Sequence, residues 1–270
     1  MIIKDSIAEY HAKPSVSKTK LWRLLSDTPA KFKWLEDHPE PPTAAMQFGS
    51  ALHKYVLEPD GFFDEYAVAP QCDRRTKAGK EEYQAFVENV QNKAVISADD
   101  MVLIAEMTGA IRSNPRADFL LRGEVETSYY WQDDMTGLDC QARPDCVKMV
   151  DGRALIVDLK TCARADTETM VKQAYSLGYD MQAAMFIEAV SKERNVGCDF
   201  LFVCIEKDPP YLINILQADG LMIKSGQDRF REAIGIYKSC LDSGNWYGYE
   251  GAFGMVNTLG LPQWAAKEIE

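Results

Sequence analysis

The sequence has no long apolar run, no internal repeat and no paired cysteines. None of its apolar stretches approaches the roughly 18 residues that cross a bilayer, and its first residues lead straight into polar sequence, so we expect a soluble, cytoplasmic protein that does not bind membranes. The seven cysteines are odd in number and form no CxxC pair, which argues against a disulfide framework and a zinc ribbon. Without a low-complexity tract or a long Gly/Ser linker, the chain reads as a single domain, residues 1–270.

The sequence is also short of positive charge. A net charge of -11 and a pI near 4.9 would, alone, argue against a nucleic-acid partner, because phosphate binding depends on Lys and Arg. Two local basic runs soften that objection, although solvated helix faces and a charged loop are the alternative interpretation. The candidate DNA contacts in these runs are Lys18, Lys20, Arg23, Arg74, Arg75, Lys77 and Lys80.

The spacing of the apolar residues predicts an α/β protein with a helical front part. Residues 1–122 are expected to be mainly helical, and residues 123–245 to form an α/β core in which strands and helices are layered. Residues 246–270 are rich in aromatic side chains and are expected to pack on the body or on a neighbouring subunit. In the core, strands are predicted over 124–131, 154–160, 199–205 and 211–216, and a further strand, the second of a hairpin, is predicted to end near 149. Helices are predicted over 166–190 and 220–241.

Two neighbouring strands of this core carry acids near their ends. Strand side chains alternate between faces, so Asp158 and Lys160 project side by side from the strand 154–160. In the preceding strand Pro144 cannot donate to the sheet ladder, which predicts an edge, a bulge or a strand end at that point. Because only a short turn separates the two strands, Asp145 is expected to lie close to Asp158.

Carboxylates brought together near neutral pH repel each other unless a cation or a proton lies between them. Mg²⁺ binds oxygen ligands and commonly uses one or two carboxylates, so Asp145 and Asp158 are candidate metal ligands. Glu126, or Glu124 on the same strand face, could add a third acid, and Lys160 could orient or help deprotonate a water molecule. The alternatives are a turn residue at Asp145, a surface ion pair between Asp158 and Lys160, and a solvated Glu126.

The order of these residues resembles the PD-(D/E)XK nuclease fold, in which an acid and a short hairpin precede an Asp-x-Lys that ends an apolar strand. Over nearly its whole length the chain is similar to the RecB-like branch and, within it, to the RecE-type phage exonucleases (exonuclease VIII). Gly49–His53 matches a GxxxH motif, Arg143–Asp145 and Asp158–Lys160 match the two core motifs, and Gln182 begins a QxxxY-like motif in which Phe186 replaces the tyrosine. This resemblance implies a mixed central sheet flanked by helices, with a helical N-terminal elaboration.

The resemblance also implies a set of site residues and a cofactor. The metal would be Mg²⁺, which Mn²⁺ could replace, and no iron–sulfur cluster is expected because Cys240 is the only late cysteine. The implied metal ligands are His53, Asp145, Asp158 and the backbone carbonyl of Leu159. The implied catalytic residues are Lys160, Asp158, Asp145, Glu126, Gln182 and Tyr179.

In function, the resemblance implies an exodeoxyribonuclease that digests linear double-stranded DNA from 5′ to 3′ and leaves 3′ single-stranded tails for recombination and repair. It further implies a homo-oligomeric ring, a RecT-like single-strand annealing partner, and a phage or prophage origin in a bacterial cell. A ring would reconcile the acidity with DNA binding, because basic segments could line its channel. The alternatives are an endonuclease or single-strand-specific nuclease on the same fold, and a non-catalytic acidic protein that binds a DNA-processing partner.

Overall fold

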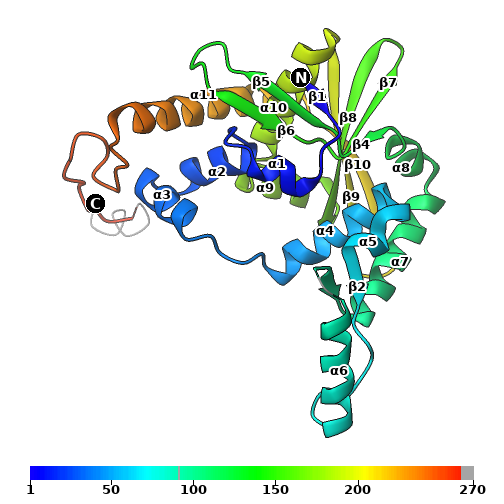
Figure 1. Ribbon diagram of the computed structural model, residues 1–270. Helices are drawn as coiled ribbons and strands as arrows, with labels where there is room; N and C mark the ends of the chain where they lie inside the picture. The colour runs from blue at the N-terminus through cyan, green and yellow to red at the C-terminus, as the bar shows by residue number, and fades with distance from the viewer. Residues whose placement is uncertain (91, 263–270) are drawn as a thin grey trace.

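The computed structural model describes residues 1–90 and 92–262, and its body is built on a mixed five-stranded sheet (Figure 1). The strand order is β10-β9-β8-β7-β4, and all neighbours are antiparallel except the parallel pair β8 and β9. The strands are β4 (Glu124–Val125), β7 (Cys146–Val150), β8 (Arg153–Cys162), β9 (Cys198–Glu206) and β10 (Ile213–Gln217). This arrangement confirms the predicted α/β fold with a mixed central sheet.

A second, three-stranded antiparallel sheet contains the parts of the two hairpin strands that lie next to the hairpin turn. It has the order β1-β5-β6, with β1 (Ile2–Ile3), β5 (Ser128–Gln132) and β6 (Asp139–Ala142). The prediction of one continuous strand over 124–131 was wrong, because Glu126 adopts a φ of 47° between β4 and β5. The partner strand also breaks, between β6 and β7 at Pro144, as its missing N–H predicted. The end of the hairpin next to its turn, β5 and β6, thus belongs to the three-stranded sheet, and the other end, β4 and β7, belongs to the five-stranded sheet.

Five helices pack on one side of these sheets. They are α2 (Lys18–Ser26), α3 (Pro29–Asp37), α9 (Thr167–Ser176), α10 (Tyr179–Arg194) and α11 (Gly220–Ser243). The single helix predicted over 166–190 is in fact two, because Gly178 has a φ of 65° and ends the first helix. A Cβ at Gly178 would lie 2.4 Å from Trp22 Cε3, so α2 packs directly against this junction. Gly178 therefore sets the angle at which α10 begins.

The front part of the chain supplies the other helices and is not purely helical, since it also contributes strand β1 and two further short strands. The helical elements are α1 (Ile7–Ala12), α4 (Ala44–Leu57), η1 (Pro59–Gly61), α5 (Phe62–Glu65), α6 (Lys77–Asn89), α7 (Ala98–Ser113) and α8 (Pro115–Leu120). The short strands β2 (Tyr66–Val68) and β3 (Ala94–Ile96) pair in parallel at the base of α6. In Figure 1 α6 projects away from the body.

Two apolar clusters sandwich the five-stranded sheet. Strand alternation sends Ile156 and Phe200 to the cluster beneath α2, α10 and α11, and sends Val157, Leu159 and Val203 to the cluster beneath α4 and α7. The sheet is therefore covered on both faces, and among the described residues no helix is long and apolar enough to span a membrane. Burial on both faces explains why β8 and β9 are largely apolar.

The C-terminal segment was expected to pack on the body or on a neighbouring subunit, and its first residues do pack on the body. Trp246 stacks on Phe32 with 5.7 Å between ring centroids, and the Tyr247 carbonyl accepts a hydrogen bond from the Ala30 N–H at 3.0 Å. Tyr249 and Phe253, in contrast, are 83% and 92% exposed. Trp264, which was expected to pack as well, lies outside the described residues.

Candidate active site

The ends of β7 and β8 bring the predicted acids and lysine together. Cys146 pairs with Val157, so Asp145, one residue before β7, lies opposite Asp158. Asp145 Oδ2 accepts a hydrogen bond of 2.7 Å from the Leu159 N–H, and Lys160 Nζ lies 2.6 Å from Asp158 Oδ2. The structure thus confirms the juxtaposition that the strand spacing predicted.

Three further elements add polar side chains to this pair. His53, on α4, places Nδ1 3.3 Å from Asp145 Oδ2. Gln182, on α10, donates from Nε2 to Asp158 Oδ1 at 2.5 Å. Glu126, between the two sheets, approaches closely enough that ligand atoms of His53, Glu126 and Asp145 all lie within 4.8 Å of one another.

The structure distinguishes Glu126 from Glu124, which the sequence left open. The left-handed backbone at Glu126 turns its side chain toward the cluster, while its N–H donates to the Asp145 carbonyl at 3.1 Å. Glu124 is exposed and pairs instead with Arg194 on the outside of the molecule. Of the two glutamates, Glu126 therefore lies at the cluster, and the strand break between the sheets positions it there.

The charges of the site are strongly coupled because its groups are buried. Burial alone would raise the pKa of Asp145, but His53, Lys160 and the Leu159 N–H hold it below its usual range. Burial would lower the pKa of His53, yet the neighbouring Asp145 raises it to about 9. Burial raises the pKa of Asp158 and, together with the Asp145 charge, that of Glu126. A cation or a proton between these acids would relieve their mutual repulsion.

The donor set fits a hard divalent cation. Asp158 Oδ2 is buried, and Lys160 Nζ balances its charge at 2.6 Å. A carboxylate oxygen has more than one lone pair, so a metal ion could bind Asp158 beside the lysine. His53, Glu126 and Asp145 could hold the ion with Asp158 beside them, and carboxylate oxygens are ligands that Mg²⁺ prefers. The Leu159 carbonyl as a further ligand stays a prediction.

A cavity of about 1070 Å³ opens onto part of this site. It is lined by Glu126, Asp145, Lys160, Tyr179 and Gln182, and also by the predicted DNA contacts Lys18, Lys20 and Arg23 on α2. Arg74, Arg75, Lys77 and Lys80 do not line it, since they lie at the start of the projecting helix α6. The structure therefore brings one of the two basic runs to the site and leaves the other apart.

Two residues of the cavity wall had no role assigned from the sequence. Arg143 donates from Nε to Glu126 at 2.8 Å and from Nη1 to Asp5 and Ser128, so it offsets the charge of the site acid. Gln141, two residues earlier on β6, is 3% exposed and its Oε1 has no hydrogen-bond partner among the described residues. The shared strand face of Gln141 and Arg143 was the signal that could have identified them.

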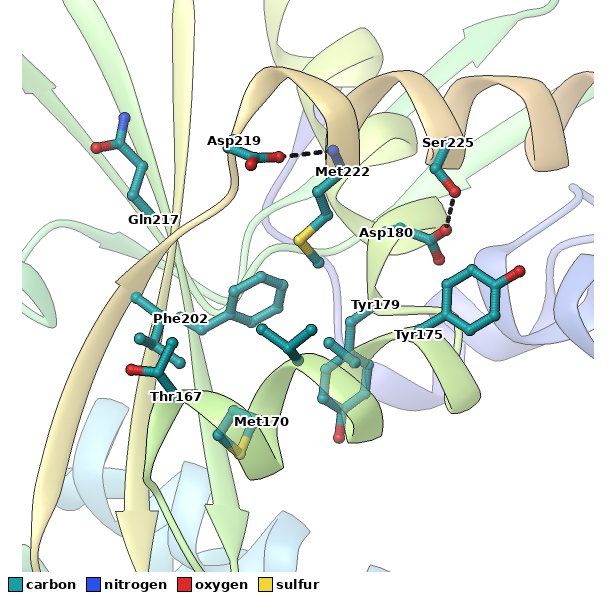
Figure 2. Close-up of a pocket in the computed structure, with 13 residues that line it drawn as sticks. Thr167, Met170, Tyr175, Tyr179, Asp180, Phe202, Gln217, Asp219, Met222 and Ser225 are labelled. Carbon is teal, nitrogen blue, oxygen red and sulfur yellow. Dashed lines mark hydrogen bonds between the residues drawn. The ribbon is translucent and has the colours of Figure 1, made fainter.

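Tyr179 separates the active-site cavity from a second, mostly apolar cavity of about 390 Å³ between α9, α10 and the start of α11. Figure 2 shows the rings of Tyr175, Tyr179 and Phe202 around that second cavity, with the Tyr179 hydroxyl directed away from Asp180. The Tyr179 ring stacks on Phe202 at 5.7 Å, and Lys160 Nζ lies 4.7 Å from its centroid. Tyr179 thus contacts the site through its ring, as a wall beside Lys160.

The fold and the motif order agree with a known protein family. Residues 15–255 match the family model described as a PDDEXK-like domain of unknown function (DUF3799). No curated protein matches the chain.

Solved structures agree at the level of the fold. A crystal structure from Eubacterium rectale described as a "putative exonuclease" superposes with a TM-score of 0.59, covers 96% of both chains and is 12% identical in sequence. The structure of SSO0001 covers 68% of this chain and 85% of its own at 13% identity, and its TM-score of 0.30 carries no argument. At such low identities the first likeness establishes the nuclease fold alone, and the RecE-type branch stays a prediction.

Proposed function

The chain belongs to the DUF3799 family of PDDEXK-like domains, and on that premise we propose that it is a Mg²⁺-dependent exodeoxyribonuclease acting on linear double-stranded DNA. The observation that carries the proposal is the meeting of His53, Glu126 and Asp145 within 4.8 Å, beside the Asp158–Lys160 pair. These residues come from four separate segments of the chain, and Glu126, Asp145 and Lys160 line one cavity. A structural ion pair alone would not require that convergence.

Each residue has a role that its contacts support. A divalent cation bound by Glu126, Asp145 and Asp158, and by His53 once the ion displaces its proton, would supply positive charge to the phosphate and make a water molecule more acidic. Asp158 and Asp145 raise the pKa of Lys160, so its Nζ keeps its proton. Lys160 is therefore suited to hold the water and the phosphate by donating hydrogen bonds, rather than to accept a proton as a base. Gln182 holds Asp158 in place.

The acidity of the chain as a whole is compatible with this function. Although the net charge is -11, the cavity that the site acids line also carries Lys18 and Arg23, whereas the charge of Lys20 is balanced by Glu36. A DNA strand in this cavity would meet these two cations beside the metal site. This distribution favours a nuclease over a non-catalytic acidic protein, for which the four candidate ligands would have no purpose.

The finer parts of the proposal rest on the resemblance to RecE-type proteins. They are digestion from 5′ to 3′, formation of a homo-oligomeric ring, cooperation with a RecT-like annealing protein in recombination and repair, a phage or prophage origin, and Mn²⁺ as a substitute for Mg²⁺. Sedimentation of the purified protein tests the ring, because a monomer of 30.4 kDa would exclude it. Pull-down with a RecT-like protein tests the partner.

Digestion of labelled DNA tests the activity and its direction together. Linear duplexes labelled at the 5′ or the 3′ end are incubated with the protein and Mg²⁺, next to closed circular DNA of the same sequence. We expect early release of the 5′ label, late release of the 3′ label and no attack on the circle. Cleavage of the circle would instead identify an endonuclease, and digestion confined to single strands would identify a single-strand-specific nuclease.

A further inference from the structure

We propose that Lys18 is a second lysine of the active site, which binds the phosphate next to the one that is cleaved. The inference rests on the proposed nuclease function and assigns Lys18 a contact with the substrate strand beside the reacting centre. This specific contact would distinguish Lys18 from the other basic residues of the chain, which are candidates for non-specific attraction of DNA.

The position of Lys18 is fixed by three contacts. Its Nζ donates a hydrogen bond of 2.7 Å to the Leu177 carbonyl, next to the Gly178 junction. The same Nζ lies 5.6 Å from the ring centroid of Trp22 and 5.8 Å from that of Tyr179. Since Lys160 Nζ lies 4.7 Å from the Tyr179 centroid, one aromatic ring has both ammonium groups beside it. Lys18 is therefore held at the reacting centre.

The charge of Lys18 has no counter-ion. Among the described residues no carboxylate forms an ion pair with its Nζ, whereas Lys20, on the same helix and in the same cavity, pairs with Glu36 at 3.4 Å. Burial and the charge of Lys160 lower the pKa of Lys18 to about 8, although the more distant charges of Asp158 and Asp180 act in the opposite direction. A half-buried ammonium without an acid is unfavourable in the free protein unless an anion joins it.

A phosphate is the anion that this position fits. An ammonium carries three N–H donors, and the Leu177 carbonyl occupies one of them, which leaves two for a ligand. The cavity that Lys18 lines also holds Lys160 and Asp145, so a strand whose phosphate lies at Lys160 would pass Lys18 within the same cavity. The acids of the site repel a second negative charge, and Lys18 offsets that repulsion on the wall where α2 begins.

The test compares Lys18→Gln with Lys20→Gln and Lys18→Arg. Lys18→Gln removes the charge while keeping a polar side chain that can donate hydrogen bonds, and Lys18→Arg keeps the charge. Binding of a fluorescein-labelled linear duplex is measured by anisotropy in EDTA over a range of salt concentrations, and kcat and KM are measured with Mg²⁺. Circular dichroism confirms that each variant is folded.

We expect Lys18→Gln to weaken DNA binding and raise KM by about 10- to 100-fold, as for the loss of one charge-assisted contact. The slope of log K against log salt should fall by about 1, which a purely structural change would not produce. Lys18→Arg should retain most of the binding. Lys20→Gln should change it by less than about 3-fold, because Glu36 already neutralises that lysine.

The outcomes separate this inference from the nuclease function. If wild type digests DNA and Lys18→Gln behaves like Lys20→Gln, the role of Lys18 is refuted and the nuclease stands. If wild type binds the duplex without cleaving it, the nuclease is refuted, and the binding and salt slope of Lys18→Gln still decide the role of Lys18. If wild type neither binds nor cleaves DNA, both proposals are wrong.

Discussion

Two glycines of the same helix should respond to alanine in opposite directions. On α11, a Cβ at Gly226 would lie 1.9 Å from the Asp180 carbonyl oxygen, so α10 and α11 touch through their backbones there. At Gly235 a Cβ would meet nothing within 4 Å. Alanine favours a helix over glycine by about 0.5–1 kcal/mol, which Gly235→Ala should gain in full.

Gly226→Ala should lose far more than it gains. Overpacking typically costs about 1–3 kcal/mol, and a clash with backbone belongs at the upper end of that range. After the helical gain the net loss should be about 2 kcal/mol, or roughly 4–8 °C in Tm for a chain of this size. Because Asp180 lies two residues before Gln182, the displaced α10 should also weaken the Gln182 contact with Asp158 and reduce kcat.

Thermal unfolding followed by circular dichroism measures both variants beside wild type. The account expects Gly235→Ala at or slightly above the wild-type Tm and Gly226→Ala clearly below it. A Gly226→Ala protein as stable as Gly235→Ala would show that α10 and α11 are not in backbone contact, and the argument about how α10 is positioned would be refuted.

Three further perturbations probe the site and its support. Gln182→Met should lower kcat/KM about 10- to 100-fold in a digestion assay with little change in Tm, because Asp158 Oδ1 loses its donor; an unchanged rate would exclude that role. Arg143→Met should lower the unfolding free energy by about 1–3 kcal/mol in urea titration, since half-buried Glu126 loses its cation while Asp5 keeps Lys13 at 3.6 Å; an unchanged unfolding free energy would contradict the pairing. Burial would raise the pKa of Asp133, but hydrogen bonds from Thr136 and the charge of Arg231 hold it below 3.8. The contribution of Asp133 to stability is therefore complete above pH 3.8 and disappears as the pH falls through the pKa of Asp133 in the folded state. Urea midpoints from pH 6 to pH 3 should therefore fall less steeply for Asp133→Asn, and parallel curves would refute this.

The parts of the site that follow strand geometry could be predicted from the sequence. Alternation alone places Asp158 beside Lys160, and the short hairpin places Asp145 opposite them. Pro144 marked the strand break because it lacks an N–H. These predictions succeeded because they depend on local periodicity, which tertiary packing does not override.

The parts that depend on packing between distant segments could not be predicted. The left-handed conformation of Glu126 separates β4 from β5, and no local pattern marks it, since glutamate rarely adopts that conformation. The break at Gly178 follows from the close approach of Trp22, more than 150 residues away in sequence. The position of Lys18 beside Tyr179 depends on this junction, because Lys18 donates to the Leu177 carbonyl. The sequence motifs identified the residues, and the tertiary fold determined how they meet.

The most direct test of the central claim is the metal dependence of DNA digestion by wild type and by Asp145→Asn. Release of acid-soluble nucleotides from linear duplex DNA is measured with Mg²⁺, with Mn²⁺ and with EDTA, and calorimetry measures Mn²⁺ binding to both proteins. The account predicts digestion by wild type with either metal, none in EDTA, and loss of both digestion and Mn²⁺ binding in a folded Asp145→Asn protein. Full digestion by Asp145→Asn, or digestion by wild type in EDTA, would contradict it.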